Sequence, residues 1–341
     1  MTFQHGGQLE RIKKENPDQL LPWVDLSTGI SPLSYPVESG VMDSFTELPQ
    51  CSEALKKAAM EYYGSRGLLL TPGSMWSIQN LPLLRRLLCS NDQRPVLIPK
   101  QGFNEHKKAW LSWGYQIEQY DDIPNSHQLR ASQVCVVINP NNPTGKLLEP
   151  ETLLSMHREL SKHNAWLLVD EAFMDMTPEN SLVANAPIEH LIILKSFGKF
   201  FGLPGLRLGA LIGPEDVLKS ASKLLNDWSI NSAAQKIAMS AWQDQTFHYQ
   251  AKFYINGGYE RLSSMLNKLG YQTQGTKLFQ TYYCADAQFL YRHLLEYGIY
   301  VRLLDDKSGI RFALPKEQTH WERLEQVLSL YERAGIKNNP L

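Results

Sequence analysis

The stretch "ILKSFGKFFGLPGLRLG", residues 193–209, combines a fold signal with a chemical one. Its apolar start is typical of a buried strand, and two lysines, Lys195 and Lys199, stand four positions apart just after it. A neutral lysine amine in an apolar setting can attack a carbonyl group, and an arginine such as Arg207 can hold a phosphate with paired hydrogen bonds. A lysine taken alone, however, is far more often a solvated surface group.

Apolar runs that precede this stretch predict a mostly parallel sheet. The runs Val134–Ile138 and Trp166–Val169 do not alternate with polar residues, which indicates strands that are covered on both faces. We therefore expect an α/β fold with a large domain over residues 46–228. After residue 228 short strands mix with helices, which indicates a smaller α+β domain made of residues 1–45 and 229–341.

The overall composition excludes several classes of function. The 341 residues carry 34 Lys plus Arg against 35 Asp plus Glu, so no basic excess favours a nucleic acid or an anionic membrane as partner. No apolar stretch approaches the length of a membrane span or a signal peptide. The 4 cysteines form no close pair and the 9 histidines show no ligand spacing. We expect a cytoplasmic protein without a metal site.

A second motif is "LLLTPGSMWSIQ", residues 68–79, in which a strand gives way to a helix. Gly73 and Ser74 form the turn between them. The backbone N–H groups at a helix start, together with the helix dipole, make a phosphate site. The alternative is a plain turn in which Ser74 caps the helix.

Two more motifs follow predicted strands. In "VVINPNNPTG", residues 136–145, prolines and a glycine end the strand while asparagines offer donors and acceptors. In "WLLVDEAF", residues 166–173, Asp170 ends a buried strand, where a carboxylate is costly unless it meets a donor or cation. A protonated pyridine ring would be such a partner. The alternatives are an ordinary turn for the first motif, and a helix cap or an arginine pair for Asp170.

Together and in this order, the four motifs resemble the fold-type I pyridoxal-5′-phosphate (PLP) enzymes of the aminotransferase class I/II group. The resemblance covers nearly the whole chain and implies a PLP-dependent transferase-like fold with PLP as cofactor. Lys199, in "SFGK", is similar to the lysine that binds the cofactor's aldehyde, and Asp170 to the carboxylate that keeps the pyridine nitrogen protonated. Both are therefore the expected catalytic residues, whereas Lys195 is structural or exposed. The resemblance implies nine cofactor-binding residues: Ser74, Met75, Phe103, Asn142, Asp170, Ala172, Ser196, Lys199 and Arg207.

Two departures from the family pattern point to a narrower likeness. Phe173 stands where many aminotransferases have a tyrosine, and Leu48, in "ELPQ", stands where histidinol-phosphate aminotransferases tend to have one. With "HGG" at 5–7 and "DLSTGISPLSYP" at 25–36, they resemble the L-threonine-O-3-phosphate decarboxylase branch of cobalamin biosynthesis. This implies decarboxylation of a small phosphorylated amino acid. The alternatives are a histidinol-phosphate or related phospho-amino-acid aminotransferase, and a non-catalytic PLP-binding regulatory domain.

A phosphorylated substrate requires a second anion site. The resemblance implies that Arg311, in "GIRFALP", binds the substrate α-carboxylate. The candidates for the substrate phosphate are His5 with the glycine amides beside it, including that of Gly7, then residues near Ser27 to Ser31, and then Arg302. Each has a plainer alternative: a flexible tail, a turn and a surface arginine. The resemblance also implies a homodimer.

Overall fold

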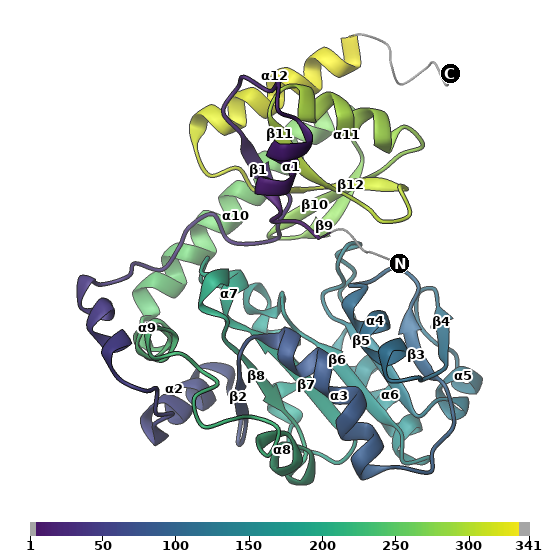
Figure 1. Cartoon of the computed structure of the whole chain (residues 1–341). Helices are drawn as coiled ribbons and strands as arrows, with labels where there is room; N and C mark the ends of the chain where they lie inside the picture. The colour runs from purple at the N-terminus through teal and green to yellow at the C-terminus, as the bar shows by residue number, and fades with distance from the viewer. Residues whose placement is uncertain (1–4, 334–341) are drawn as a thin grey trace. The chain divides into compact units, whose positions relative to one another are not determined.

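The computed structural model describes residues 5–333, which divide into two compact units (Figure 1). Within this range, unit 1 comprises residues 5–33, 143–145 and 250–333, and unit 2 comprises residues 34–142 and 146–249. The domain boundaries expected from the sequence, after residues 45 and 228, stay a prediction.

Unit 2 is built on a seven-stranded sheet. Its strands, in spatial order, are β2 (Leu69–Thr71), β8 (Gly209–Ile212), β7 (Leu191–Ser196), β6 (Trp166–Asp170), β5 (Val134–Ile138), β3 (Val96–Pro99) and β4 (Ile117–Tyr120). All pairings from β7 to β4 are parallel, and β8 alone runs against its two neighbours. The predicted α/β class with a mostly parallel sheet is confirmed.

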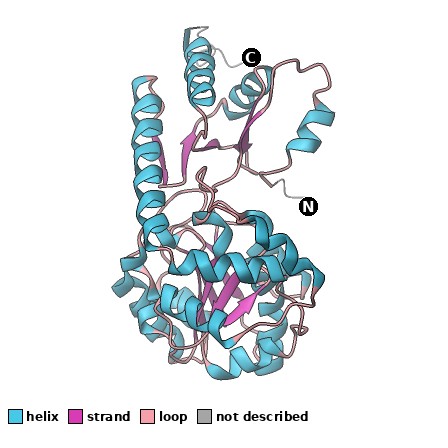
Figure 2. Ribbon diagram, turned by 90° about the vertical axis from the view of Figure 1, so that its left-hand side faces the viewer, coloured by secondary structure: helices cyan, strands magenta, loops and turns pink. Residues whose placement is uncertain are grey.

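Helices cover both faces of this sheet, as Figure 2 shows. Because side chains alternate along a strand, Leu168, Ile192 and Leu194 pack on one face, whereas Leu167 and Ile193 pack on the other. The first face carries α3 (Ser74–Leu88), α4 (Glu105–Ser112) and α8 (Glu215–Ser222). The second carries α5 (Ser126–Ala131), α6 (Pro150–Ser161) and the 3-10 turn η4 (Leu182–Asn185). The strands are therefore buried on both sides, which explains their continuous apolar runs.

The remaining elements of unit 2 are short, apart from two helices. They are η1 (Ser39–Thr46), α2 (Glu53–Tyr63), η2 (Met174–Met176), η3 (Pro178–Asn180), α7 (Phe197–Phe200), η5 (Pro204–Leu206) and α9 (Ser232–Gln243). Helix α2 ends on Gly64, whose φ of 69° is left-handed, as its sequence predicts. Helix α10 (Gln245–Lys268) begins in unit 2 and continues in unit 1.

Unit 1 contains a five-stranded sheet in the order β1 (Val24–Leu26), β11 (Ile299–Leu303), β12 (Gly309–Ala313), β10 (Phe279–Tyr283) and β9 (Thr273–Thr276). Only β1 pairs in parallel, with β11. Its helices are α1 (Leu9–Glu15), α11 (Ala287–Glu296), α12 (Gln318–Arg333) and most of α10. The N-terminal segment therefore supplies an edge strand to a sheet that is otherwise made by the last third of the chain.

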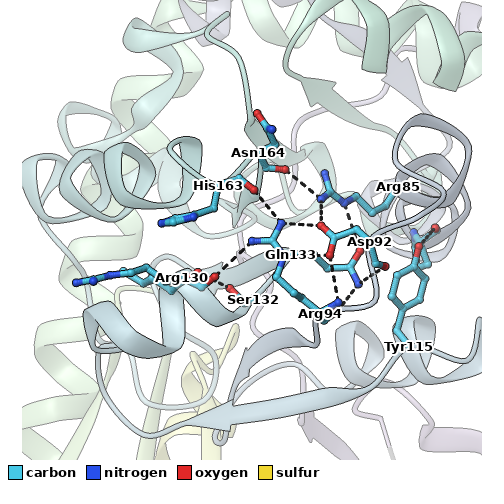
Figure 3. Close-up of polar contacts among 11 residues, drawn as sticks. Arg85, Asp92, Arg94, Tyr115, Arg130, Ser132, Gln133, His163 and Asn164 are labelled. Atoms are coloured by element: carbon cyan, nitrogen blue, oxygen red, sulfur yellow. Dashed lines mark hydrogen bonds and ion pairs between the residues drawn. The ribbon is translucent and has the colours of Figure 1, made fainter.

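The amino-terminal ends of β3, β5 and β6 are joined by a buried charged network, the Arg85 network (Figure 3). Arg85, on α3 and 1% exposed, donates to Oδ2 of Asp92 at 2.8 Å and to the carbonyl of Asn164 at 3.1 Å. Arg94 donates to the same carboxylate at 2.7 Å, and Gln133 lies 3.4 Å from Nε of Arg85. Burial acts to raise the pKa of Asp92, but the hydrogen bonds and charges of Arg94 and Arg85 outweigh it and leave that pKa low.

Candidate active site

The turn from β2 into α3 forms the first part of the site. Gly73 has a φ of 82°, a left-handed conformation that favours glycine. A Cβ atom at this position would lie 2.7 Å from Nη2 of Arg207, so the guanidinium group packs directly against the turn. The first N–H groups of a helix have no partner within it, and the helix dipole is positive there. The turn and Arg207 together can therefore bind an anion such as a phosphate.

Ser196 lies beside this turn. It pairs with Gly209 in the β7–β8 ladder, and a Cβ atom on Gly209 would lie 2.7 Å from the backbone nitrogen of Ser74. The glycine thus allows β8 to touch the start of α3. As a result, four residues with groups that can bind an anion lie around the β2–α3 turn. They are Ser74, Met75, Ser196 and Arg207.

Asp170 ends β6 on the face that carries α3 and α4. Its Oδ2 lies 2.9 Å from Nε2 of His106, and its Oδ1 accepts a hydrogen bond from the N–H of Ala172 at 3.0 Å. Asp170 and His106 are both buried, and the ring of Phe103 meets that of His106 edge to face at 6.4 Å. The partner of Asp170 is thus a histidine, and neither the arginine nor the helix start that the sequence left open.

His106 is a residue that the sequence analysis missed. Its only signal is position: it lies three residues after Phe103, in the first turn of the short helix α4, and its backbone N–H donates to the carbonyl of Phe103 at 3.1 Å. Because His106 holds one carboxylate oxygen of Asp170, the orientation of that carboxylate is fixed. A fixed, buried carboxylate is suited to keep a proton on a heteroaromatic nitrogen.

Lys199 lies on the short helix α7, one turn after β7. Its Nζ is 5.4 Å from the centroid of the Phe173 ring, which follows β6, so the amine lies over the end of the neighbouring strand. A Cβ atom on Gly198 would be 2.7 Å from Cα of Pro204, which shows how closely the following chain packs back on this helix. The residue that replaces the family's tyrosine is therefore a direct neighbour of this lysine.

The "NPNNPTG" loop is fastened at its base by Asn139. This buried amide donates to the carbonyl of Leu148 at 3.0 Å and accepts from its N–H at 2.7 Å. The backbone N–H of Asn139 also donates to the carbonyl of Asp170 at 2.8 Å. Asn142 lies half-buried three residues further along this fastened loop. One asparagine of the motif is thus structural, and its hydrogen bonds tie the loop to the strand end that bears Asp170.

Lys195 is buried rather than exposed. Its Nζ lies 2.6 Å from Oε2 of Glu171, and both side chains are removed from solvent. Of the two roles left open by the sequence, the structural one is correct. The strand pattern could have indicated this, because a charged residue within a doubly covered strand must find a partner.

In unit 1, Arg311 and Arg302 face each other as cross-strand neighbours on β12 and β11. Arg311 is buried, donates to the carbonyl of Ser27 at 2.9 Å and stacks 4.9 Å from the centroid of Phe279. Burial and then the charge of Arg302 lower the pKa of Arg311 to about 9. Arg302 donates to Asp305 at 2.8 Å. Two cations at this spacing favour a bound anion, because it would offset their repulsion.

His5 and Gly7 lie against the same part of unit 1. The carbonyl of His5 accepts from the hydroxyl of Tyr300 at 3.2 Å, and the N–H of Gly7 donates to Oγ of Ser27 at 2.7 Å. A Cβ atom on Gly6 would lie 2.2 Å from the carbonyl oxygen of Ser27, so only glycine fits there. The structure therefore brings Gly7 and Arg311 to one residue, Ser27, and joins His5 to Tyr300.

Other kinds of site receive no support from the described residues. Between residues 5 and 333, no group of three or more His, Cys, Asp or Glu side chains could hold a metal ion. Over the same span, helix length and apolarity nowhere reach what a membrane crossing requires. The four cysteines, Cys51, Cys89, Cys135 and Cys284, are free thiols.

Comparison with known proteins identifies the family of the chain. The model of the family "Aminotransferase class I and II" matches residues 3–313. The threonine-phosphate decarboxylase of Pseudomonas aeruginosa is 35% identical over 327 residues, which cover 96% of this chain and 97% of the relative. The histidinol-phosphate aminotransferase of Thermoanaerobacter pseudethanolicus is 30% identical, but over only 59% of this chain and 56% of the relative.

A solved structure supports the fold. The histidinol-phosphate aminotransferase of Clostridium acetobutylicum superposes with a TM-score of 0.77 and covers 91% of this chain and 99% of its own. At 22% identity this likeness concerns the fold alone.

Proposed function

We propose that this chain, which belongs to the aminotransferase class I and II family and is PLP-dependent, decarboxylates L-threonine O-3-phosphate to (R)-1-amino-2-propanol O-2-phosphate and CO2. The observation that carries the proposal is the extent of the match. Similarity to the decarboxylase spans 96% of the chain, whereas similarity to the histidinol-phosphate aminotransferase spans 59%. The product belongs to cobalamin biosynthesis, and we place the enzyme in that pathway.

The residues of unit 2 fit PLP. A phosphate suits the cradle that Gly73 opens beside Arg207, and Ser74, Met75 and Ser196 add donors to it. In our proposal Lys199 binds the cofactor's aldehyde, Asp170 holds its ring nitrogen, and Asn142 donates to its 3-oxygen. Phe103 and Ala172 flank the ring. When bound, PLP supplies an electron sink for the bond that breaks at the substrate Cα.

The protein residues then decide which bond breaks. The bond held perpendicular to the cofactor ring is the one that is weakened, so a decarboxylase must orient the α-carboxylate there. We assign that orientation to Arg311, whose buried guanidinium suits a carboxylate. After CO2 leaves, Nζ of Lys199 or a water delivers the proton to Cα.

The substrate phosphate is assigned to His5, Gly7 and Arg302. The support is that Gly7 and Arg311 both bond Ser27, that His5 bonds Tyr300, and that Arg302 is the cross-strand neighbour of Arg311. Replacement of His5 by Ala should raise the KM for threonine phosphate. Unchanged affinity would remove His5 from the site.

We also propose a cytoplasmic homodimer. The segment around η1 exposes four apolar side chains, Val37, Met42, Phe45 and Leu48, each more than half accessible in the single chain. A solvent-exposed apolar group of this size favours burial against a second copy. Light scattering should give twice the chain mass, and Phe45→Lys with Leu48→Lys should shift the mass toward a monomer.

One incubation separates the proposed reaction from its alternatives. The holoenzyme with threonine phosphate should release CO2 without any keto acid. Conversion of the cofactor to its amine form, reversed by 2-oxoglutarate, would instead indicate an aminotransferase. Bound cofactor with no turnover of phosphorylated amino acids would indicate a regulatory domain.

A further inference from the structure

We propose that Lys195 and Glu171 are positioning residues, a buried ion pair behind the cofactor site that fixes the ends of β6 and β7. The inference rests on the proposed cofactor site of unit 2, though not on the identity of the substrate. Neither residue is part of that site, and neither side chain is exposed to solvent.

The first step is the alternation of side chains at the strand ends. Leu168 and Asp170 face α3 and α4, so Glu171 faces the opposite core, with Leu167 and Val169. On β7, Lys195 continues the series of Leu191 and Ile193 on that same opposite face, next to Ser196. Each member of the ion pair is thus the covalent neighbour of a proposed cofactor-binding residue: Glu171 of Asp170, and Lys195 of Ser196.

The second step is the geometry of the pair. Besides the 2.6 Å contact with Lys195, the carboxylate of Glu171 accepts from the hydroxyl of Ser181 at 2.5 Å and from the N–H of Leu182 at 2.9 Å. Nζ of Lys195 also donates to Oγ of Ser181 at 3.2 Å and lies 5.6 Å from the centroid of the Tyr63 ring. Hydrogen bonds and the ion pair hold each side chain from more than one side. Apolar packing alone would not fix their orientation in this way.

A further buried carboxyl group, that of Asp175, lies near Lys195. Asp175 accepts from the hydroxyl of Tyr62 at 2.9 Å. Burial raises the pKa of Asp175, and the charge of Lys195 is the first influence that opposes this rise. Removal of Lys195 would therefore leave two carboxylates, Glu171 and Asp175, in one buried region without their cation.

The third step is energetic. A buried ion pair is often no more stabilising than well-packed apolar residues, so its contribution to stability does not account for its presence. What it adds is a fixed distance between two strand ends. The N–H of Glu171 donates to the carbonyl of Leu194 at 3.0 Å, so the ladder between β6 and β7 ends at this pair. Phe173 follows the end of β6, and Lys199 follows the end of β7.

The test compares Lys195→Met with Arg85→Met in the full-length holoenzyme. Both changes remove a buried cation from the same unit, but Arg85 lies at the opposite edge of the sheet. We expect Lys195→Met to raise the dissociation constant of PLP roughly 10- to 100-fold, as small misplacements of binding groups do. It should also move the pH at which the absorbance of the lysine-bound cofactor changes. Arg85→Met should leave both readouts unchanged while lowering the urea midpoint.

Two further variants keep the test decisive. Lys195→Arg should restore most of the PLP affinity, because it keeps the charge. Glu171→Gln keeps the shape of the side chain and one of its two acceptor oxygens while it removes the charge, so it replaces Lys195→Met if that protein does not fold. Equal PLP affinity and equal absorbance titration in wild type, Lys195→Met and Glu171→Gln would overturn the inference. A wild type that binds no PLP would instead overturn the proposed function.

Discussion

Charged networks are buried at both ends of the strands in the unit 2 sheet, at the amino-terminal edge and at the carboxyl-terminal edge. The two networks differ in the groups that their charges face. At the amino-terminal edge, Arg85 and Arg94 enclose Asp92, and the charges are used on each other and on backbone carbonyls. At the carboxyl-terminal edge, Lys195 and Glu171 neutralise each other on one face, while Asp170 and Arg207 present charge to the other. A buried charged residue thus indicates a functional site only where its charged group faces a possible ligand and is not fully used by neighbouring protein groups.

The largest effect should come from the carboxyl-terminal edge. Lys199→Ala should lower the rate of CO2 release roughly 10²–10⁴-fold, because it leaves water alone to deliver the proton to the substrate Cα. The protein should also lose its borohydride-reducible attachment to the cofactor. Mass spectrometry after borohydride treatment measures this, with Lys195→Arg as a control that keeps the attachment. Attachment that persists in Lys199→Ala would assign the role to another lysine.

The next effect concerns stability at the opposite edge. Arg85→Met should lower the free energy of unfolding by about 3 kcal/mol, since it removes a buried charge that serves Asp92, Gln133 and Asn164. Asp92 keeps Arg94, which places the loss at the low end for a broken buried pair. Urea unfolding measures the loss. A fall in PLP affinity that matches the fall in stability would erase the contrast between the two edges.

A comparison of two glycines, Gly73 and Gly64, measures how much the turn at Gly73 beside Arg207, the phosphate cradle, contributes to PLP affinity. Gly73→Ala and Gly64→Ala both place a side chain at a left-handed φ, 82° and 69°, and each should cost about 1–2 kcal/mol of stability. Only at Gly73 would the new Cβ atom meet Arg207, at 2.7 Å, whereas the space at Gly64 is open. We expect PLP affinity to fall about tenfold or more in Gly73→Ala alone. Equal affinities, measured by equilibrium dialysis, would contradict the cradle.

The smallest effect is a difference in pH dependence between Asp92 and Asp175. The pKa of Asp92 is lowered, so its ionisation stabilises the fold above its unfolded value of 3.8, and this is lost as pH falls through the folded pKa. The pKa of Asp175 is raised, chiefly by burial, so its ionisation costs stability at neutral pH and the cost fades as pH falls. Between about pH 7 and about pH 4, wild type should therefore gain stability relative to Asp175→Asn but not relative to Asp92→Asn. Urea titrations at both pH values test this.

Much of the fold could be predicted, because doubly covered strands leave a direct trace in sequence. The apolar runs over residues 134–138 and 166–169 correspond to β5 and β6, and the apolar start of residues 193–209 lies in β7. The motifs at the strand ends contain Ser74, Asp170 and Lys199, and the family resemblance assigned these residues to one cofactor site, an assignment that stays a prediction. The sequence could not predict which side chains distant along the chain form hydrogen bonds with each other. No local pattern links His106 to Asp170, which are 64 residues apart, or Ser181 to Lys195.

The alternation at the end of β6 also makes this enzyme sensitive to insertions. Asp170 and Glu171 are consecutive acids that face opposite cores, so a one-codon deletion or insertion within the strand would exchange them. The composition would change by a single residue, yet each carboxylate would meet the environment of the other. For engineering this chain, point substitutions in β6 are thus safer than length changes, and length variation is better confined to surface loops.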